Sequence, residues 1–175
     1  MRRVMVIGQP GAGKSTFARQ LEARTGLPVV HLDTIHWKPG WVARSLREKI
    51  PLIRAEEDKD RWIIEGGLSA TWDTRLARSD MLVWIDVGLT RRLCRVLLRS
   101  WRYRGQSRPD LTEGCPEQFN LETLRFVAFI IRTWRPGRRR MAQVFGSYGK
   151  PKVLLASIAE MEAWLASLEP CLTDR

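Results

Sequence analysis

The residues Gly8-Gln9-Pro10-Gly11-Ala12-Gly13-Lys14-Ser15 match the phosphate-binding pattern G-x-x-x-x-G-K-[ST] at every fixed position. The apolar run Val4-Met5-Val6-Ile7 before them predicts a short strand, and residues 15–21 after them have helical spacing. In this setting glycines let consecutive backbone N–H groups turn toward a polyphosphate at the start of a helix. The stretch therefore predicts a Walker A loop, around which the rest of the chain is interpreted.

Two side chains of this loop indicate a nucleoside triphosphate bound with a divalent cation. Lys14 would bring a positive charge to the β- and γ-phosphates, and the Ser15 hydroxyl would join the coordination shell of Mg²⁺. A glycine-rich turn that binds nothing is disfavoured, because neither residue serves packing there. We expect ATP and Mg²⁺ as ligands. The predicted nucleotide-binding residues are Gly8, Pro10, Gly11, Ala12, Gly13, Lys14, Ser15 and Thr16, together with Arg104 further along the chain.

Length and composition predict one α/β domain spanning residues 1–175. The chain is 44% hydrophobic and 28% charged, as is usual for a globular protein. No charge-free apolar run approaches the roughly 18 residues of a membrane span. Met1-Arg2-Arg3 leads directly into the first strand without a signal-peptide pattern, so we expect a cytoplasmic protein. Cys94, Cys115 and Cys171 lack metal-ligand spacing and are expected to be free thiols.

The formal net charge of +11 is concentrated in two blocks of arginine. Residues 91–108 contain seven arginines and no acid, and residues 125–140 contain six more, again without an acid. Arginine favours bidentate recognition of phosphate. A solvated basic face that attracts any polyanion loosely is the other interpretation, and nucleic acid is one such polyanion.

Acidic residues follow two of the predicted parallel strands. Asp33 ends the run from Leu27 to Leu32, and Glu65 ends the run from Trp62 and leads into Gly66. The carboxyl ends of parallel strands carry the ligand site of an open α/β sheet. We expect Asp33 to orient an acceptor hydroxyl group, and Ser15 with either Glu65 or Asp33 to hold the metal ion. A helix N-cap is the alternative role for Asp33. Further strands are predicted over residues 80–87 and 153–155.

The segment of about residues 34–60 is predicted to bind the acceptor. Trp37 and Trp41 would form the wall of a pocket or, equally well, cover a small satellite core. A helix is expected over residues 43–59. Candidate acceptor-binding residues are Asp33, Trp37, Arg44, Arg47, Glu65, Gly66 and Arg75, the arginines being suited to an anionic acceptor.

A lid is predicted over about residues 104–119, where helical or strand periodicity is absent. Gly105 and Gly114 would serve as hinges, and Arg104 and Arg108 would donate positive charge. We see no apolar stripe that would pin the segment to the core. A solvated loop whose arginines contact nothing is the alternative. The helix expected over residues 121–144 has a candidate break at Pro136-Gly137.

The order of these motifs, above all Arg108-Pro109-Asp110-Leu111 followed by Glu113-Gly114-Cys115-Pro116-Glu117, resembles the bacterial DNA topology modulation proteins, which are adenylate-kinase-like P-loop proteins. The resemblance spans about residues 4–140. It implies a three-layer P-loop NTPase fold of the nucleoside monophosphate kinase type. The implied sheet has five parallel strands in the order 2-3-1-4-5, with an acceptor-binding helix after strand 2 and an Arg-rich lid.

The residues Glu65-Gly66-Gly67-Leu68-Ser69 depart from true adenylate kinases, which have a Pro-Arg pair after strand 3. The two glycines are similar to those of shikimate- and gluconate-type kinases, so the acceptor stays open. The sequence favours an ATP-dependent phosphotransferase acting on a small acceptor such as a nucleoside monophosphate, with Lys14, Asp33 and Arg108 as catalytic residues. A nucleotide-dependent DNA-binding protein with little kinase activity, and a nucleotide-binding regulator, are the alternatives.

Overall fold

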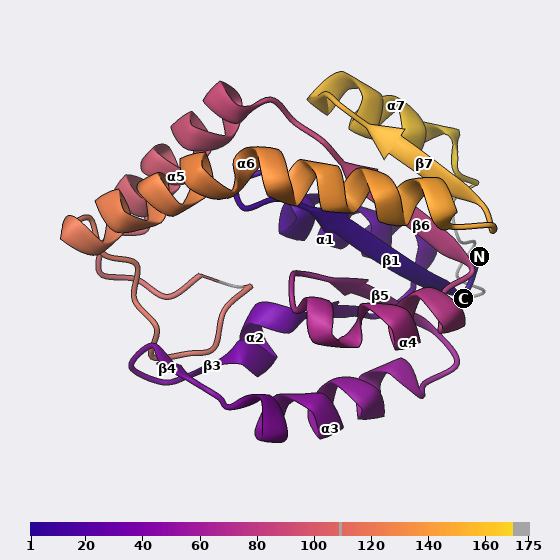
Figure 1. Ribbon diagram of the computed structural model, residues 1–175, viewed down its shortest axis with the longest axis horizontal. Helices are drawn as coiled ribbons and strands as arrows, with labels where there is room; N and C mark the ends of the chain where they lie inside the picture. Colours follow the sequence, from indigo (N-terminus) through magenta and orange to yellow (C-terminus); the bar gives the residue numbers. More distant parts are fainter. Residues whose placement is uncertain (109, 170–175) are drawn as a thin grey trace.

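Five parallel strands form one sheet in the computed structural model, which describes residues 1–108 and 110–169 (Figure 1). The strands of this sheet are β1 (Arg3–Gly8), β2 (Val29–His31), β5 (Trp62–Glu65), β6 (Met81–Ile85) and β7 (Lys152–Leu155). They lie in the order β2-β5-β1-β6-β7. Numbered within the sheet alone, this order is 2-3-1-4-5, which confirms the predicted fold class.

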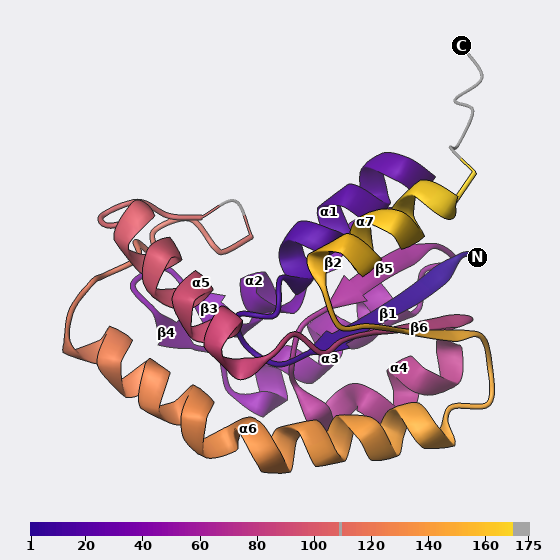
Figure 2. The ribbon, with the colours of Figure 1, turned by 90° about the horizontal axis from the view of Figure 1, so that it is seen from above.

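Helices cover both faces of the sheet (Figure 2). They are α1 (Lys14–Thr25), α2 (Leu32–His36), α3 (Leu46–Glu57), α4 (Trp72–Arg78), α5 (Leu89–Arg102), α6 (Leu121–Ser147) and α7 (Ile158–Ser167), with a 3₁₀ turn, η1, at Ser69–Thr71. The helix predicted from residue 43 begins three residues later, because Ser45 forms a capping box with Glu48.

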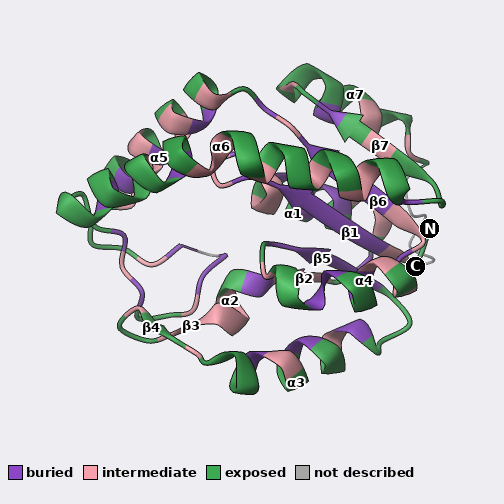
Figure 3. Ribbon diagram, in the orientation of Figure 1, coloured by how far each residue is buried: buried purple, intermediate pink, exposed green. Residues whose placement is uncertain are grey.

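Alternating side chains of β1 divide the core into two parts. Val4 and Val6 pack on the face covered by α1 and α7, and Met5 and Ile7 pack on the face covered by α3, α4 and α6. All four are almost completely buried, and each contributes roughly 1.5–3 kcal/mol by leaving water. Figure 3 shows β1 buried along its length, whereas most of α6 is exposed. Strand β1, which leads into the phosphate loop (residues 8–15), is thus held firmly in the core.

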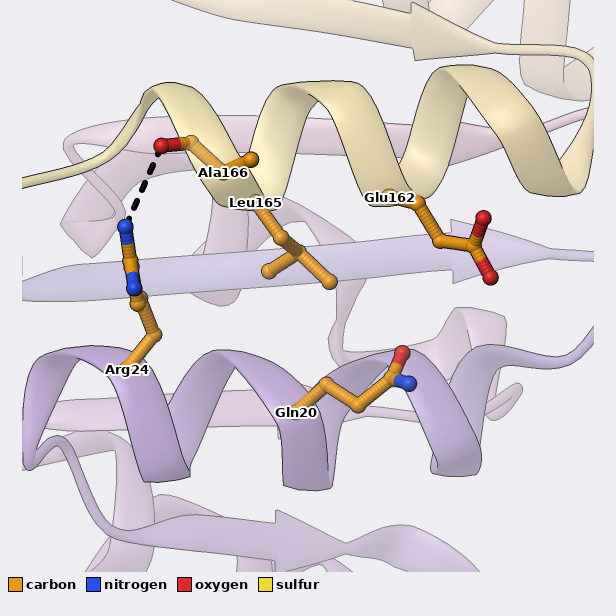
Figure 4. Close-up of a pocket in the computed structure, with 5 residues that line it drawn as sticks. All are labelled: Gln20, Arg24, Glu162, Leu165 and Ala166. Carbon is orange, nitrogen blue, oxygen red and sulfur yellow. Dashed lines mark hydrogen bonds between the residues drawn. The ribbon is translucent and has the colours of Figure 1, made fainter.

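The closing helix α7 is tied to α1 near the C-terminal ends of both helices. Arg24 of α1 donates to the carbonyl oxygens of Ala166 and Leu168 at 3.1 Å each. Figure 4 shows Arg24 reaching Ala166, with Leu165 directed toward α1. Leu165 is buried, and the hydrogen bonds of Arg24 lie at the end of the apolar contact that Leu165 makes with α1. This pairing fixes the helix that begins at the phosphate loop.

Helix α6 is continuous, and the candidate break at Pro136-Gly137 is wrong. A proline inside a helix removes one N–H donor and disturbs the carbonyl groups of the preceding turn. Here the side-chain amide of Gln9 donates to the carbonyl oxygens of Trp134 at 2.8 Å and Thr133 at 3.2 Å. Gly137 leaves room for this amide, since a Cβ there would lie 2.6 Å from Gln9 Nε2. A side chain of the phosphate loop therefore donates hydrogen bonds to carbonyl groups of α6 in the turn before its proline.

The predicted lid packs against the small hairpin of β3 (Trp37–Lys38) and β4 (Val42–Ala43). Gly40 N–H donates to the Gly114 carbonyl at 2.8 Å, and Trp41 Nε1 donates to the Pro116 carbonyl at 2.9 Å. Leu111 and Cys115 of the lid are buried. The described part of the segment has no apolar stripe, but two separated apolar side chains and the hydrogen bonds of the hairpin hold it in place.

No helix in the described part of the chain is long and apolar enough to cross a membrane. The cytoplasmic location stays a prediction. Cys94 is an exposed free thiol and Cys115 a buried one, as expected, and Cys171 lies outside the described residues. The boundaries assigned to the acceptor segment and the lid also stay predictions.

Candidate active site

A cavity of about 1340 Å³ opens at the carboxyl ends of the parallel strands. It collects most of the site residues predicted from the sequence. Those that line it are Gly8, Pro10, Gly11, Gly13, Lys14, Ser15, Thr16, Asp33, Trp37, Glu65, Gly66 and Arg108. Ala12, Arg44, Arg47, Arg75 and Arg104 are not among the lining residues.

The phosphate loop has the geometry of an anion cradle. Gly13, with φ of 100°, is the N-cap of α1, and no side chain caps that helix in the described structure. A residue with a Cβ rarely adopts such a φ, and the uncapped first turn leaves N–H groups for an anion. Lys14 Nζ donates to the Gln9 carbonyl at 3.3 Å, across the mouth of the loop. The side chain of Ala12 is buried beneath the loop, so any contact with a ligand comes from its backbone.

Two arginines of α5 donate hydrogen bonds to backbone carbonyl groups of this loop. Arg92 Nε donates to the Pro10 carbonyl at 2.9 Å, and Arg95 Nη1 donates to the Ala12 carbonyl at 2.8 Å. By holding these carbonyl groups, they favour a loop whose N–H groups face the cavity. The sequence predicted either phosphate recognition or a solvated basic face for this block. The three-residue spacing of Arg92 and Arg95 on one helix was a signal that they share a target.

Glu65 joins the phosphate loop to β2. Its Oε1 accepts hydrogen bonds from Ser15 Oγ at 2.9 Å and is 2.7 Å from Nδ1 of His31. Burial acts to raise the pKa of Glu65, but the hydrogen bond with His31 and the charge of Lys14 outweigh it and lower the pKa. Glu65 is therefore an ionised carboxylate beside the Ser15 hydroxyl. His31 was not recognised from the sequence, where it appears as one polar residue within an apolar strand.

Asp33 reaches the same cavity from the start of α2. Its neighbour Leu32 packs closely on Gly66, where a Cβ would lie 2.8 Å from Leu32 Cβ and φ is 127°. Gly66 thus lets the end of β5 approach α2 and brings Asp33 near Glu65. Solvent in the cavity reaches Asp33, while the surrounding protein and then the negative charge of Glu65 raise the pKa of its carboxyl group.

The residues around Ser15 fit a magnesium ion that is held mainly by nucleotide phosphates. No group of three or more His, Cys, Asp or Glu side chains within the described ranges could hold a metal unaided. Magnesium bound with a nucleotide needs few protein ligands, because phosphate oxygens and water supply the others. The Ser15 hydroxyl would provide one direct ligand, and the ionised Glu65 carboxylate would accept a hydrogen bond from metal-bound water.

Arg108 extends from the lid into the cavity between two carboxylates. Its Nη1 donates to Asp110 Oδ2 at 3.0 Å, and its Nε lies 2.7 Å from Glu117 Oε1. Arg99 of α5 lies 3.4 Å from the same Glu117 oxygen. The charge of Arg108 acts against the raised pKa of Asp33, so the two residues lie near one another at the strand ends. Arg108 is therefore buried and paired, unlike a side chain of a solvated loop.

Four arginines that were predicted to contact ligands do not line the cavity: Arg44, Arg47, Arg75 and Arg104. Arg44 folds back on its own loop, where Nη1 donates to the carbonyl groups of Thr34, Ile35 and Trp37 at 2.9–3.1 Å. Arg47 is exposed on the first turn of α3, and Arg104 is exposed at the start of the lid. Sequence spacing placed them near the site but did not determine which way each side chain points.

Arg75 is a structural residue of the buried interior. It is 0% exposed and donates through Nη2 to the carbonyl groups of Gly67 at 2.8 Å and Leu68 at 2.7 Å. Its Nε lies 3.6 Å from Glu57 Oε1, and burial lowers the pKa of Arg75 to about 10. Arg75 therefore fixes the turn after β5 rather than facing a ligand.

We expect Arg75→Met to lower the free energy of unfolding by about 3–5 kcal/mol, because Glu57 would be left buried without its counter-charge. Chemical denaturation measures the change. The double variant Glu57→Gln with Arg75→Met should recover a large part of it. A stable Arg75→Met protein with weakened acceptor binding would instead support the role predicted from the sequence.

Trp37 lines the cavity, and its ring meets that of Trp41 edge-on with centroids 5.3 Å apart. Trp41 also lines the cavity, and its indole N–H is engaged by the lid carbonyl of Pro116. Both tryptophans line the cavity, as the first interpretation expected, and neither belongs to a described core cluster; Trp41 also links the hairpin to the lid.

No protein-family model matches the chain, and no curated protein does. Its structure is similar to that of a shikimate kinase from Acinetobacter baumannii in complex with shikimate, with a TM-score of 0.51, 17% sequence identity, and coverage of 93% of this chain and 88% of that chain. A gluconokinase from Sinorhizobium meliloti 1021 gives a TM-score of 0.49 at 15% identity, with coverage of 94% and 91%. An unliganded sugar kinase from Janibacter sp. HTCC2649 gives 0.48 at 15% identity, with coverage of 95% and 93%.

At such low identity the likeness to the shikimate kinase concerns the fold. The resemblance to DNA topology modulation proteins stays a prediction from the sequence. The chain has the α/β fold of a P-loop kinase.

Proposed function

We propose that the protein is an ATP-dependent kinase that transfers a phosphoryl group to a hydroxyl group of a small acceptor. The observation that carries the proposal is a single cavity shared by Lys14, Ser15, Asp33, Glu65 and Arg108. Its volume of about 1340 Å³ exceeds the roughly 300–1,000 Å³ of a pocket for one small ligand. The cavity therefore has room for a nucleotide and an acceptor together.

Each of these side chains has a part in an in-line transfer. The backbone of the phosphate loop and Lys14 bind the β- and γ-phosphates, and Ser15 and Glu65 hold Mg²⁺ directly or through water. When bound, Mg²⁺ neutralises charge on the phosphates. Asp33 orients the acceptor hydroxyl and accepts its proton as the new O–P bond forms and the bond to the β-phosphate oxygen breaks. Arg108 stabilises the charge of the transferring group.

The acceptor is bound between α2, the β3–β4 hairpin and the turn after β5. This part of the cavity includes Leu32, His36, Trp37, Ile53 and Leu68, which combine apolar and aromatic surface. Nucleoside monophosphates and polyhydroxy acids such as shikimate and gluconate are the acceptor classes to compare. Shikimate is also the ligand in the structure of the similar Acinetobacter kinase.

The arrangement of the first arginine block, residues 91–108, favours this proposal over a DNA-binding function, whereas the six arginines of residues 125–140 are exposed. Arg92, Arg95, Arg99 and Arg108 belong to the first arginine block, and each is held by a group of the protein near the phosphate loop or the lid. Positive charge at these positions serves an internal site, and Arg91, Arg102 and Arg104 remain exposed on the surface. Loose attraction of nucleic acid would follow from the net charge alone.

The test is an ATP-consumption screen over nucleoside monophosphates and small hydroxy acids, with and without chelation of Mg²⁺, beside binding of duplex DNA at low and physiological salt. We expect one acceptor class to stimulate Mg²⁺-dependent ATP consumption. DNA should bind weakly, compete with ATP, and lose affinity steeply between about 50 and 200 mM salt, as counterion release requires. Sequence-selective DNA binding at physiological salt, without stimulation by any acceptor, would support the alternative.

A further inference from the structure

Lys49 is a buried lysine on the cavity side of α3. Lys49, Ile53 and Glu57 are the buried residues of this helix, spaced one turn apart, which is the spacing of a core-facing stripe. Lys49 is 6% exposed, and it lines the cavity. The stem of the side chain is thus packed in protein, and its ammonium group belongs to the wall of the acceptor region. A helix normally places an apolar residue at such a position.

The acids nearest to Lys49 along α3 are engaged with other cations. Glu48 pairs with Lys38 at 2.6 Å, and Glu57 pairs with Arg75 at 3.6 Å. Among the described residues no hydrogen bond or ion pair involves the Lys49 side chain. The Lys49 ammonium group therefore meets the cavity without a counter-charge from the described protein, which leaves it available to an anionic ligand.

Other cations of the cavity differ from Lys49 because each has a group of the protein to bind. Lys14 and Arg95 donate to backbone carbonyl groups of the phosphate loop. Arg99 and Arg108 lie beside Glu117. These residues surround the place where the phosphates of a nucleotide would lie. Lys49 is the cation that the described protein leaves unpaired within the cavity.

Lys49 lies on the opposite side of the cavity from α5. Helix α3 packs against α2, and Figure 1 shows both in the lower part of the molecule, below β1 in that view, while α5 and α6 lie in the upper part. His36 of α2 is close enough that, after burial, the positive charge of Lys49 contributes to lowering its pKa, whereas Asp33 acts to raise it. Lys49, His36 and Asp33 therefore form one neighbourhood, on the side assigned to the acceptor.

We propose that Lys49 binds an anionic group of the acceptor, a carboxylate or a phosphate, while Asp33 faces the hydroxyl group that is phosphorylated. The inference rests on the proposed kinase function and narrows it to acceptors that carry a negative charge. Lys49 takes the part that the sequence suggested for Arg44, Arg47 and Arg75, none of which lines the cavity.

The experiment compares acceptors in pairs that differ in one charged group, gluconate with glucose and AMP with adenosine, using MgATP. Wild type is compared with Lys49→Met, which removes the charge but keeps an unbranched side chain. The matched control is Lys38→Met, whose lysine is in the neighbouring hairpin and pairs with Glu48 outside the cavity. The two pairs distinguish a carboxylate from a phosphate as the group that is bound.

We expect turnover of the charged member of one pair and little of its neutral counterpart. Lys49→Met should raise the KM for that acceptor roughly 10- to 100-fold, as loss of a charge-assisted hydrogen bond does. Its kcat and its Kd for MgADP should change less, and Lys49→Arg should restore part of the KM. Its melting temperature should stay close to that of wild type, because the described structure gives the Lys49 ammonium group no hydrogen bond or ion pair to lose. Lys38→Met should match wild type in KM.

Equal turnover of charged and neutral acceptors, or an unchanged KM in Lys49→Met, would overturn the inference and leave the kinase proposal standing. If no acceptor is phosphorylated, the kinase proposal fails, and inorganic phosphate becomes the probe, titrated calorimetrically into protein saturated with MgADP. Wild type should then bind phosphate at least about tenfold more tightly than Lys49→Met. Equal phosphate affinity in the two proteins would reject the anion site itself.

Discussion

The Lys14→Ala protein is expected to keep a melting temperature close to that of wild type and to lose ATP affinity by roughly 10²-fold or more. Two charge-assisted contacts, to the β- and γ-phosphates, disappear together in this variant. In the described structure the Lys14 ammonium contacts the Gln9 carbonyl at 3.3 Å and forms no ion pair, so folding depends little on it. The variant therefore separates nucleotide binding from stability.

Calorimetric titration with a non-hydrolysable ATP analogue in the presence of Mg²⁺ and a thermal melt of the same sample measure the two quantities. Lys59→Ala is a suitable control, because Lys59 is an exposed lysine paired with Glu56 outside the cavity. It should bind nucleotide as wild type does. A folded Lys14→Ala protein with unaltered nucleotide affinity would show that the loop does not bind phosphate through this lysine.

The second large effect is expected for Arg108→Ala, which should lower kcat by roughly 10²-fold or more with a smaller change in the KM for ATP. A kinase must exclude water from the γ-phosphate until the acceptor is in place, and a charged lid does this while stabilising the transition state. Arg108 is suited to this part because Asp110 and Glu117 hold its guanidinium within the cavity. The side chain is thus preorganised before the nucleotide arrives.

Steady-state kinetics with the identified acceptor measure this effect, and Arg102→Ala provides the control. Arg102 is an exposed arginine at the end of α5, outside the cavity, and its loss should leave kcat near that of wild type. Glu117→Gln should have an intermediate effect, since Arg108 loses one of its two carboxylates. A kcat of Arg108→Ala within a factor of two of wild type would exclude the transition-state role.

The sequence could predict the sheet, the phosphate loop and the strand-end acids because these features depend on local patterns. Apolar runs define the strands. Because the strands are parallel, the residues that follow their carboxyl ends, Asp33 and Glu65, lie at the same edge of the sheet. The order of the five strands came from the resemblance to P-loop proteins, and the structure has the same order.

The roles of the basic residues could not be predicted, because a long side chain can reach several partners from one backbone position. Arg44 and Arg75 were both expected to bind the acceptor, yet Arg44 binds its own loop and Arg75 is 0% exposed beside Glu57. Lys49 shows the opposite error. It appears as one more charge in a polar helix, and only the packing of α3 reveals that it lies on the buried stripe.

The contacts that hold the lid segment could not be predicted for a related reason. Its sequence has no periodicity, and the structure indeed forms neither a helix nor a long strand over the described residues there. Its stability comes from single contacts with a hairpin about 75 residues earlier, such as that of Trp41 with Pro116. Contacts of this kind leave no repeating pattern in the sequence.

The hydrogen bonds of Gln9 affect how the lid segment can move. Its amide group is bonded to α6, which follows the lid in the chain, and its side-chain oxygen accepts a hydrogen bond from Arg92 of α5, which precedes the lid. One glutamine thus links the loop that would hold the phosphates to the first turn of α5 and to the middle of α6, the two helices that flank the lid. An outward movement of either helix at these points would break a hydrogen bond to that loop. A rearrangement that admits or releases a ligand is therefore expected to involve the segment between the two helices, or to carry the phosphate loop along with it.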